Sequence, residues 1–152
     1  MKNKLTQEVV RVEILGPAGP VDQYAAGAPL YSSPVEAGFP SPAEDFIERS
    51  LNLHTYLVHN EAATFFVRAH GDSMINAGIH NNDLLVVDRS VPAENNRIVI
   101  AALDGELTVK RLVRRQNKVF LAAANPDYPD FDITHSEYIH IWGVVRYAIH
   151  KL

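Results

Sequence analysis

The stretch IVIAALDGELTVKRL, residues 98–112, contains two runs of β-branched and aliphatic residues on either side of Asp104-Gly105. A type I′ turn needs positive φ at both central positions, and Asp-Gly is among the pairs that adopt it most readily. Residues 98–103 and 106–112 are therefore predicted to form the two strands of an antiparallel hairpin. This is the strongest hairpin signal in the chain, and it indicates a β fold.

Four further segments after Ala63 are rich in β-branched and aromatic residues, as strands are. They are Thr64 to Ala69, Leu84 to Asp88, Val119 to Ala123 and Tyr138 to Ile149. Together with the hairpin they predict a mostly β protein, built as a small, strongly curved sheet or partial barrel. A chain of 152 residues is long enough to bury a core without metals or disulfides.

The segment before this β region is rich in proline and glycine, which disfavour helix and favour extended or turn conformations. We therefore expect residues 1–40 to form an extended N-terminal arm. The alternation of Val10, Val12 and Ile14 predicts one short strand within it. Residues 41–152 are expected to form the β domain.

A short helix is predicted to begin at Ser41. Ser41 is a good N-cap, Pro42 suits the first helical position, and Glu44 completes a capping box. Apolar residues follow at helical spacing, namely Phe46, Ile47 and Leu51. A second helical stretch is predicted from Leu53 to Val58, on a weaker signal.

Composition narrows the possible functions. The chain has no cysteine, which rules out disulfides, a thiolate nucleophile and a cysteine-based zinc site. Its net charge is -4 with no extended basic cluster, so sequence-specific DNA binding by this chain is not expected. No signal peptide or membrane span is evident. We expect a cytoplasmic protein whose partners are proteins, with no cofactor and no metal.

The segment FVRAHGDSMINAGI, residues 66–79, reads as a strand, a tight turn at Gly71, one helical turn capped by Asp72, and a stop at Gly78. Ser73 would then lie at a helix N-terminus, where unpaired amides can bind the oxyanion of an attacked carbonyl. The amides of Asp72 and Ser73 are the candidate donors. Taken alone, Gly-Asp-Ser favours the simpler interpretation of an ordinary surface turn.

A nucleophilic serine needs a base, and Lys110 is the candidate. It alternates with Thr108 and Leu112 on one face of the predicted strand, where apolar neighbours can surround it. At pH 7 about one ordinary lysine in 2,500 is neutral, so a basic role requires burial, which lowers a lysine pKa by about 3 to 5 units. Cleavage should then accelerate in alkaline solution.

The histidines are the usual alternative bases. None lies in an esterase-type nucleophile elbow, and we interpret all of them as surface or packing residues. They are His54, His59, His70, His80, His135, His140 and His150.

With these segments in place, the chain resembles the UmuD family, the self-cleaving accessory subunits of error-prone DNA polymerase V, which share a catalytic domain with LexA and phage repressors. The matching stretches are, in chain order, AGFPSPAED at 37–45, GDSM at 71–74, GI at 78–79, DLLVVD at 83–88, residues 98–110, and WGVV at 142–145. The first dozen residues have no counterpart in that resemblance.

The resemblance implies a LexA/UmuD-type peptidase fold in which Ser73 attacks, Lys110 is the general base, and the Asp72 and Ser73 amides bind the oxyanion. The substrate would be the chain's own Ala37-Gly38 bond, whose small residues suit an extended segment entering a narrow cleft. It further implies a homodimer, stimulation by RecA filaments on single-stranded DNA, and a product that joins a UmuC-like Y-family polymerase in SOS mutagenesis, with a sliding clamp as a further partner.

Other readings have specific weaknesses. A LexA-like or phage-type repressor needs a DNA-reading helix-turn-helix, for which residues 1–37 are too short and too rich in proline and glycine. A signal peptidase shares serine-lysine chemistry but works at a membrane. A catalytically silent adaptor that binds the polymerase remains open, as does a plain linker at residues 37 and 38.

Overall fold

The structure is a computed structural model that describes residues 12–19, 27–31 and 47–152. The chain separates into two compact units, one of residues 1–19 with 60–152 and one of residues 20–59. The predicted boundary between residues 40 and 41 lies outside the described residues, so the division into arm and domain stays a prediction. Within the described residues, no helix is both long and apolar enough to cross a bilayer.

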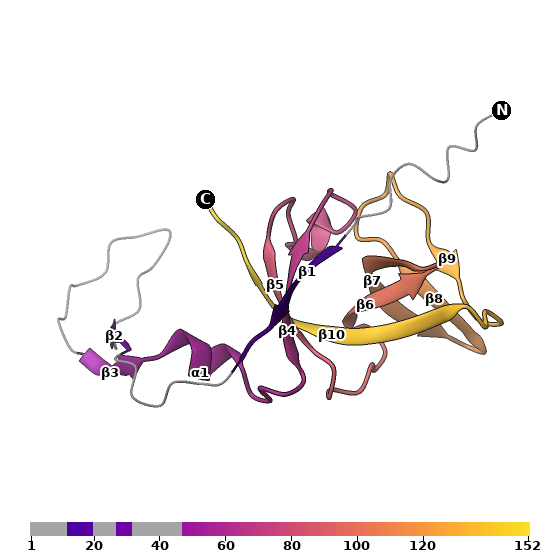
Figure 1. The fold of residues 1–152 in the computed structure, drawn as a ribbon. Helices are drawn as coiled ribbons and strands as arrows, with labels where there is room; N and C mark the ends of the chain where they lie inside the picture. Colours follow the sequence, from indigo (N-terminus) through magenta and orange to yellow (C-terminus); the bar gives the residue numbers. More distant parts are fainter. Residues whose placement is uncertain (1–11, 20–26, 32–46) are drawn as a thin grey trace. The chain divides into compact units, whose positions relative to one another are not determined.

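The larger unit is one antiparallel sheet of eight strands in the order β1-β4-β5-β10-β6-β7-β8-β9 (Figure 1). This confirms the mostly β fold class. The strands are β1 Val12–Pro17, β4 Thr64–Ala69, β5 Leu84–Asp88, β6 Ile98–Leu103, β7 Glu106–Arg115, β8 Lys118–Ala122, β9 Phe131–Asp132 and β10 Ile139–Ile149.

The predicted strands after Ala63 are all present, most of them within a residue of the expected ends. The hairpin of β6 and β7 turns at Asp104, with φ 51°, and Gly105, with φ 81°, so both central positions are positive as predicted. Its register runs from Ile98 opposite Arg111 to Leu103 opposite Glu106. The one sizeable difference is β7, which continues three residues past Leu112.

Curvature enters through β10, which pairs with β6 along its first half and with β5 along its second (Figure 1). The register shifts between Ile141 and Gly143 and again between Val145 and Tyr147. Such irregularities bend a strand and increase its twist. Because β10 bends as it passes from one partner to the other, the sheet curls and can bury side chains on both faces of the central hairpin.

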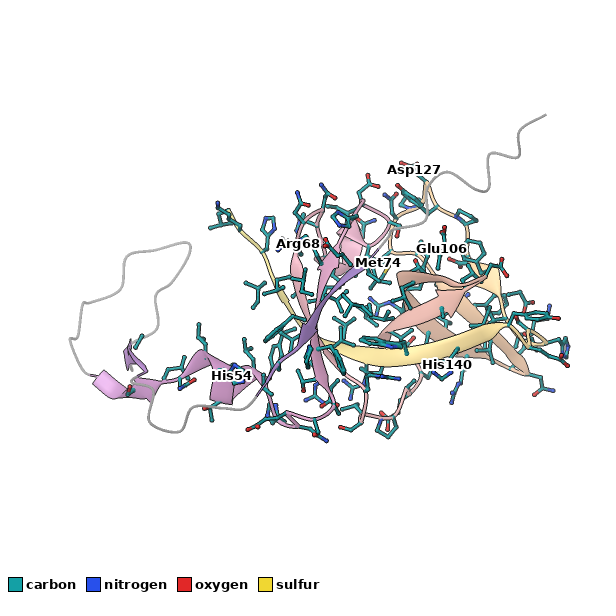
Figure 2. All side chains as sticks on the ribbon, in the orientation of Figure 1. His54, Arg68, Met74, Glu106, Asp127 and His140 are labelled. Carbon is teal, nitrogen blue, oxygen red and sulfur yellow. The ribbon has the colours of Figure 1, made fainter. Side chains whose placement is uncertain are left out.

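The core consists of two apolar clusters. One contains Val67, Ala69, Met74, Ile79, Leu85, Val87, Ile100 and Val109, and Figure 2 labels Met74 within it. The other contains Val99, Ala101, Leu112, Leu121 and Val144. Side chains alternate between the two faces of a strand, and β6 accordingly sends Ile100 to one cluster and Val99 to the other. In the middle of β7, buried residues therefore occur on both faces of the strand, as at Val109 and Lys110.

The Trp142-Gly143 pair on β10 has a packing role. A Cβ at Gly143 would lie 2.7 Å from Cγ1 of Val87, closer than real contacts allow. Arg89 donates from Nε to the carbonyl of Trp142 at 3.0 Å, and its guanidinium lies 4.7 Å from the indole ring. Gly143 thus lets β10 approach β5 closely, and Trp142 and Arg89 pack against each other beside this contact.

β1 is the outermost strand of the sheet and pairs with β4 (Figure 1). The sequence predicted a short strand here, which the structure confirms over Val12–Pro17. The strand is hydrogen-bonded into the main sheet, although its residues belong to the segment predicted to be an arm. The sequence pattern identifies the strand but does not reveal its partner.

The smaller unit pairs β2, Ala28–Tyr31, with β3, Ile47–Leu51, and continues into α1, Leu53–Leu57. The helix predicted at 53–58 is confirmed, and the side chain of Asn52 caps it by accepting from the amide of Thr55 at 3.2 Å. The helix predicted from Ser41 is wrong over 47–51, where strand pairing overrides the local helical spacing. Residues 41–46 lie outside the described residues.

Candidate active site

The predicted nucleophile Ser73 follows β4 in a compact turn. Gly71 has φ 93°, as expected for a tight turn, and Gly78 stops the following 3-10 helix, Ile75–Ala77, with φ 79°. The helix is shorter than one α-helical turn, and its N-cap is Met74, without a side-chain cap. The prediction that Asp72 caps this helix by its side chain is therefore wrong.

Asp72 instead holds a neighbouring loop. Its carboxylate accepts a hydrogen bond from the hydroxyl of Tyr128, and its carbonyl accepts from Nδ2 of Asn125 at 3.1 Å. The carbonyl of Ser73 accepts from the amide of Ala124 at 2.8 Å. Residues 124–128 thus fix the turn that presents Ser73. Sequence reasoning missed this loop, because NPDYPD at 125–130 signals turns but not what the turns contact.

Lys110 lies in the middle of β7, opposite Val99 of β6. Its Nζ is 2.9 Å from Oγ of Ser73, although the two residues are 37 positions apart in the chain. Ser73 is 0% exposed and Lys110 is 1% exposed. The structure therefore brings the two predicted catalytic side chains into hydrogen-bond contact away from water, as a nucleophile and its base require.

Burial lowers the pKa of Lys110 from its ordinary value of 10.5 to about 8, and the negative charge of Asp130 opposes part of that change. The cause is that an ammonium group loses its hydration in apolar surroundings. A useful fraction of the side chain is therefore neutral near physiological pH. When neutral, Nζ can accept the proton of the Ser73 hydroxyl; when charged, it can only donate to Oγ.

The amides next to Ser73 are available as donors. The Gly71 amide is occupied by Oδ1 of Asn81 at 2.8 Å. In the described part of the chain, the amides of Asp72 and Ser73 donate to no protein acceptor. No described histidine hydrogen-bonds to Ser73, whose side-chain partner is Lys110. The predicted cleavage bond, Ala37-Gly38, lies outside the described residues.

The buried charge of Lys110 should reduce stability at neutral pH. A fall in pKa from 10.5 to about 8 corresponds to about 3 kcal/mol at 1.4 kcal/mol per unit. The unfolded chain binds this proton more tightly, so the free energy of unfolding rises with pH between about 8 and 10.5. Lys110→Met, in a Ser73→Ala background, is expected to raise the free energy of unfolding near pH 7 by up to about 3 kcal/mol.

Denaturant unfolding of the two proteins at several pH values measures this difference, which should shrink above about pH 8 and vanish by about pH 10.5. Lys118→Met is the matched control, because Lys118 lies on the surface with its ammonium 3.7 Å from Asp132. It should change stability by less than about 1 kcal/mol. A Lys110→Met protein that is less stable than its parent at pH 7 would contradict the assigned burial cost.

Comparison with known proteins identifies the family of this chain. The profile of the family described as peptidase S24-like matches residues 29–146. Protein ImpA of Salmonella typhimurium is 45% identical over 135 residues, which cover 89% of this chain and 92% of ImpA. Protein SamA of Salmonella typhimurium strain LT2 is 48% identical over 124 residues, covering 82% of this chain and 86% of SamA.

LexA repressor 1 of Pseudomonas putida is also similar, at 39% identity over 112 residues, but the match covers only 54% of the repressor. The similarity to ImpA and SamA extends over most of this chain and most of each relative, and the matched length includes the segments that carry Ser73 and Lys110. These matches confirm the resemblance to the UmuD family. The chain belongs to the peptidase S24-like family, in its UmuD-like group.

Proposed function

We propose that the chain is a self-cleaving serine endopeptidase that cuts its own Ala37-Gly38 bond with a Ser73-Lys110 dyad. The buried 2.9 Å contact between Lys110 Nζ and Ser73 Oγ carries the proposal. Few structural roles account for a lysine at this depth with a serine hydroxyl as its hydrogen-bond partner. Membership of a peptidase family supports the same chemistry.

In the first step, neutral Lys110 takes the hydroxyl proton as Ser73 Oγ bonds to the carbonyl carbon of Ala37. The carbonyl oxygen becomes an oxyanion, to which the amides of Asp72 and Ser73 donate. Collapse of this intermediate breaks the bond to Gly38, and the ammonium of Lys110 returns the proton to the leaving nitrogen. Water then hydrolyses the Ser73 ester by the same proton transfers, releasing the Ala37 carboxylate.

We further propose that the intact chain is a homodimer whose cleavage is stimulated in the cytoplasm by RecA filaments on single-stranded DNA. The filament contributes no catalytic group; it binds the form in which the 37–38 bond is docked and so raises its population. The product beginning at Gly38 would act as the accessory subunit of a UmuC-like translesion polymerase, with the sliding clamp as a further partner. The likeness to ImpA and SamA over most of their length favours this role over that of a repressor.

The test is a time course of intact mass for the purified chain at neutral pH, with and without RecA filaments assembled on single-stranded DNA. The expected result is one new pair of masses, corresponding to residues 1–37 and 38–152, that appears faster with filaments. The same mass pair in alkaline buffer without filaments would establish the peptidase chemistry by itself. Cleavage in alkali without any stimulation at neutral pH would refute the RecA role alone.

A further inference from the structure

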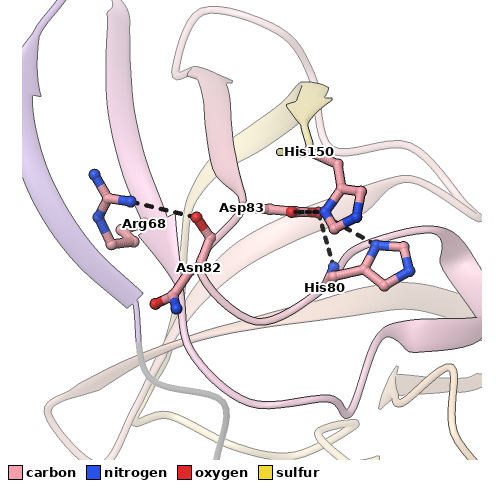
Figure 3. Close-up of polar contacts among 5 residues, drawn as sticks. All are labelled: Arg68, His80, Asn82, Asp83 and His150. Atoms are coloured by element: carbon pink, nitrogen blue, oxygen red, sulfur yellow. Dashed lines mark hydrogen bonds and ion pairs between the residues drawn. The ribbon is translucent and has the colours of Figure 1, made fainter. Parts of the chain in front are cut away.

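His80, Asp83 and His150 form a cluster outside the dyad. Two of them lie in the loop between the 3-10 helix and β5, and His150 follows the end of β10 (Figure 3). Each offers one metal-ligating atom, and the three atoms lie within 4.8 Å of one another. The chain thus brings two imidazoles and a carboxylate from distant positions to one place, although the sequence suggested only surface or packing roles for both histidines.

The carboxylate of Asp83 is held in a fixed orientation. The residue is only 2% exposed. Its Oδ2 accepts from the backbone amide of His80 at 2.8 Å, and its Oδ1 lies 2.7 Å from Nδ1 of His150 (Figure 3). A buried carboxylate with few donors retains lone pairs for a cation, and one that is oriented in advance loses little conformational freedom when a cation binds.

The ring nitrogen of His80 provides the second, independent observation. Its Nδ1 is buried and has no hydrogen-bond partner within the described residues, yet it lies 3.6 Å from Oδ2 of Asp83. A buried polar atom without a partner is costly unless something satisfies it. A cation between Nδ1 and the carboxylate would do so, because a neutral imidazole nitrogen is a good ligand for divalent transition metals.

We propose that His80, Asp83 and His150 bind a divalent transition-metal ion, with zinc as the best fit. Two imidazole nitrogens and one carboxylate oxygen form a three-residue ligand set that leaves a fourth position for water. Tetrahedral zinc with bonds of about 2.0–2.2 Å holds its ligand atoms about 3.3–3.5 Å apart. Because the three atoms lie within 4.8 Å of one another, the side chains need to close by about 1.5 Å at most.

The closing movement falls mainly on His150. The imidazole rings of His80 and His150 are stacked, with centroids 4.2 Å apart and planes at 30°, so one ring must turn before both nitrogens face a common ion. His150 lies just past the last residue of β10, and its side chain is 40% exposed, so its ring has room to turn once it gives up the hydrogen bond to Asp83. Binding replaces its hydrogen bond to Asp83 with metal coordination.

The cluster is also connected to the turn that carries Ser73. The amide of Ala69 donates to the carbonyl of Asp83 at 3.0 Å, and that of Asn82 donates to the carbonyl of Ala69 at 2.8 Å. Asn81, the residue between His80 and Asn82, accepts a hydrogen bond from the amide of Gly71 through its Oδ1. An ion at this site would therefore tie the end of β10 to the loop that supports the Ser73 turn, without touching the dyad.

The proposal is tested with the full-length Ser73→Ala protein, free of any histidine tag and stripped of metal, so that neither self-cleavage nor a tag contributes. Zinc affinity is measured by competition with a chromophoric chelator, and Co²⁺ reports the coordination geometry by its visible absorption. We expect one zinc ion per chain. His80→Gln and His150→Gln should each weaken binding by more than about tenfold, and acidification should weaken it because bound histidines must be deprotonated.

His140→Gln is the matched control, because His140 is an exposed histidine on β10, the strand that His150 follows (Figure 2). It should bind zinc as the parent does. Zinc should also raise the melting temperature of the parent and of the control, but not of His150→Gln. The proposal is overturned if the parent binds zinc no more tightly than the His80→Gln and His150→Gln variants, which would leave the cluster as a stacked, hydrogen-bonded pair of histidines.

Discussion

Replacement of Ser73 by alanine is expected to abolish self-cleavage, lowering the rate by at least about 10⁴-fold. In the proposed mechanism the hydroxyl oxygen of Ser73 bonds to the substrate carbonyl, and no other described side chain contacts Lys110 Nζ as a hydrogen-bond partner. Lys110→Ala should lower the rate by a similar factor, because the two residues act as one catalytic unit and removing either one removes the activity of both. Intact mass and gel analysis over days in alkaline buffer measures both rates.

Two matched variants separate chemistry from folding. Ser136→Ala removes an exposed serine, and Lys118→Ala removes an exposed lysine from β8. Both should cleave at the rate of the parent. Circular dichroism and unfolding curves should show that Ser73→Ala and Lys110→Ala remain folded. Continued cleavage between residues 37 and 38 in either dyad variant would refute the assignment of the nucleophile or base.

The second large effect is the dependence of the cleavage rate on pH. With a Lys110 pKa of about 8, the neutral fraction is about 1% at pH 6, about half at pH 8 and about nine-tenths at pH 9. Since only the neutral amine accepts the serine proton, the rate should rise nearly tenfold per unit up to about pH 7.5 and level off above about pH 9. The total change should approach two orders of magnitude.

Asp130→Asn tests the electrostatic origin of that profile. The negative charge of Asp130 raises the pKa of Lys110, so removing it should move the midpoint of the rate profile to lower pH. The substitution keeps the Oδ1 oxygen that accepts from the amide of Ala123 at 3.2 Å, which preserves the loop. A rate that is flat between about pH 6 and 9.5 in the folded parent, or a midpoint that rises in Asp130→Asn, would contradict the role of Lys110 as base.

Much of the fold was predictable because its signals are local. The Asp104-Gly105 turn and the β-branched runs specify β6 and β7 through the conformations of their own residues. The helix predicted from Ser41 failed over 47–51 for the opposite reason. There the backbone of β3 pairs with β2, and pairing between distant segments outweighs a capping signal worth about 1 kcal/mol.

The dyad could be proposed from sequence only because a resemblance added to weak local evidence. A lysine at a strand position is ordinarily solvated, and nothing in its sequence neighbours reveals that Ser73 and the ring of Tyr128 lie beside it. The bonds of Asp72 to Tyr128 and Asn125 are similarly invisible to periodicity. Sequence reasoning missed the histidine cluster for the same reason, because His80 and His150 come together only when β5 and β10 pair.

Strand β1 gives the proposed cut a mechanical consequence. Its residues precede Ala37, yet they occupy the outermost row of the sheet beside β4. Before cleavage the connecting chain keeps β1 at a high effective concentration near its partner; after cleavage it is a separate peptide, bound by five register pairs and subject to dilution. Loss of that peptide would leave the hydrogen-bonding groups of β4 open to another strand. Proteolysis at one bond would thereby act as the release of a tethered ligand, and dilution would determine how long the product keeps it.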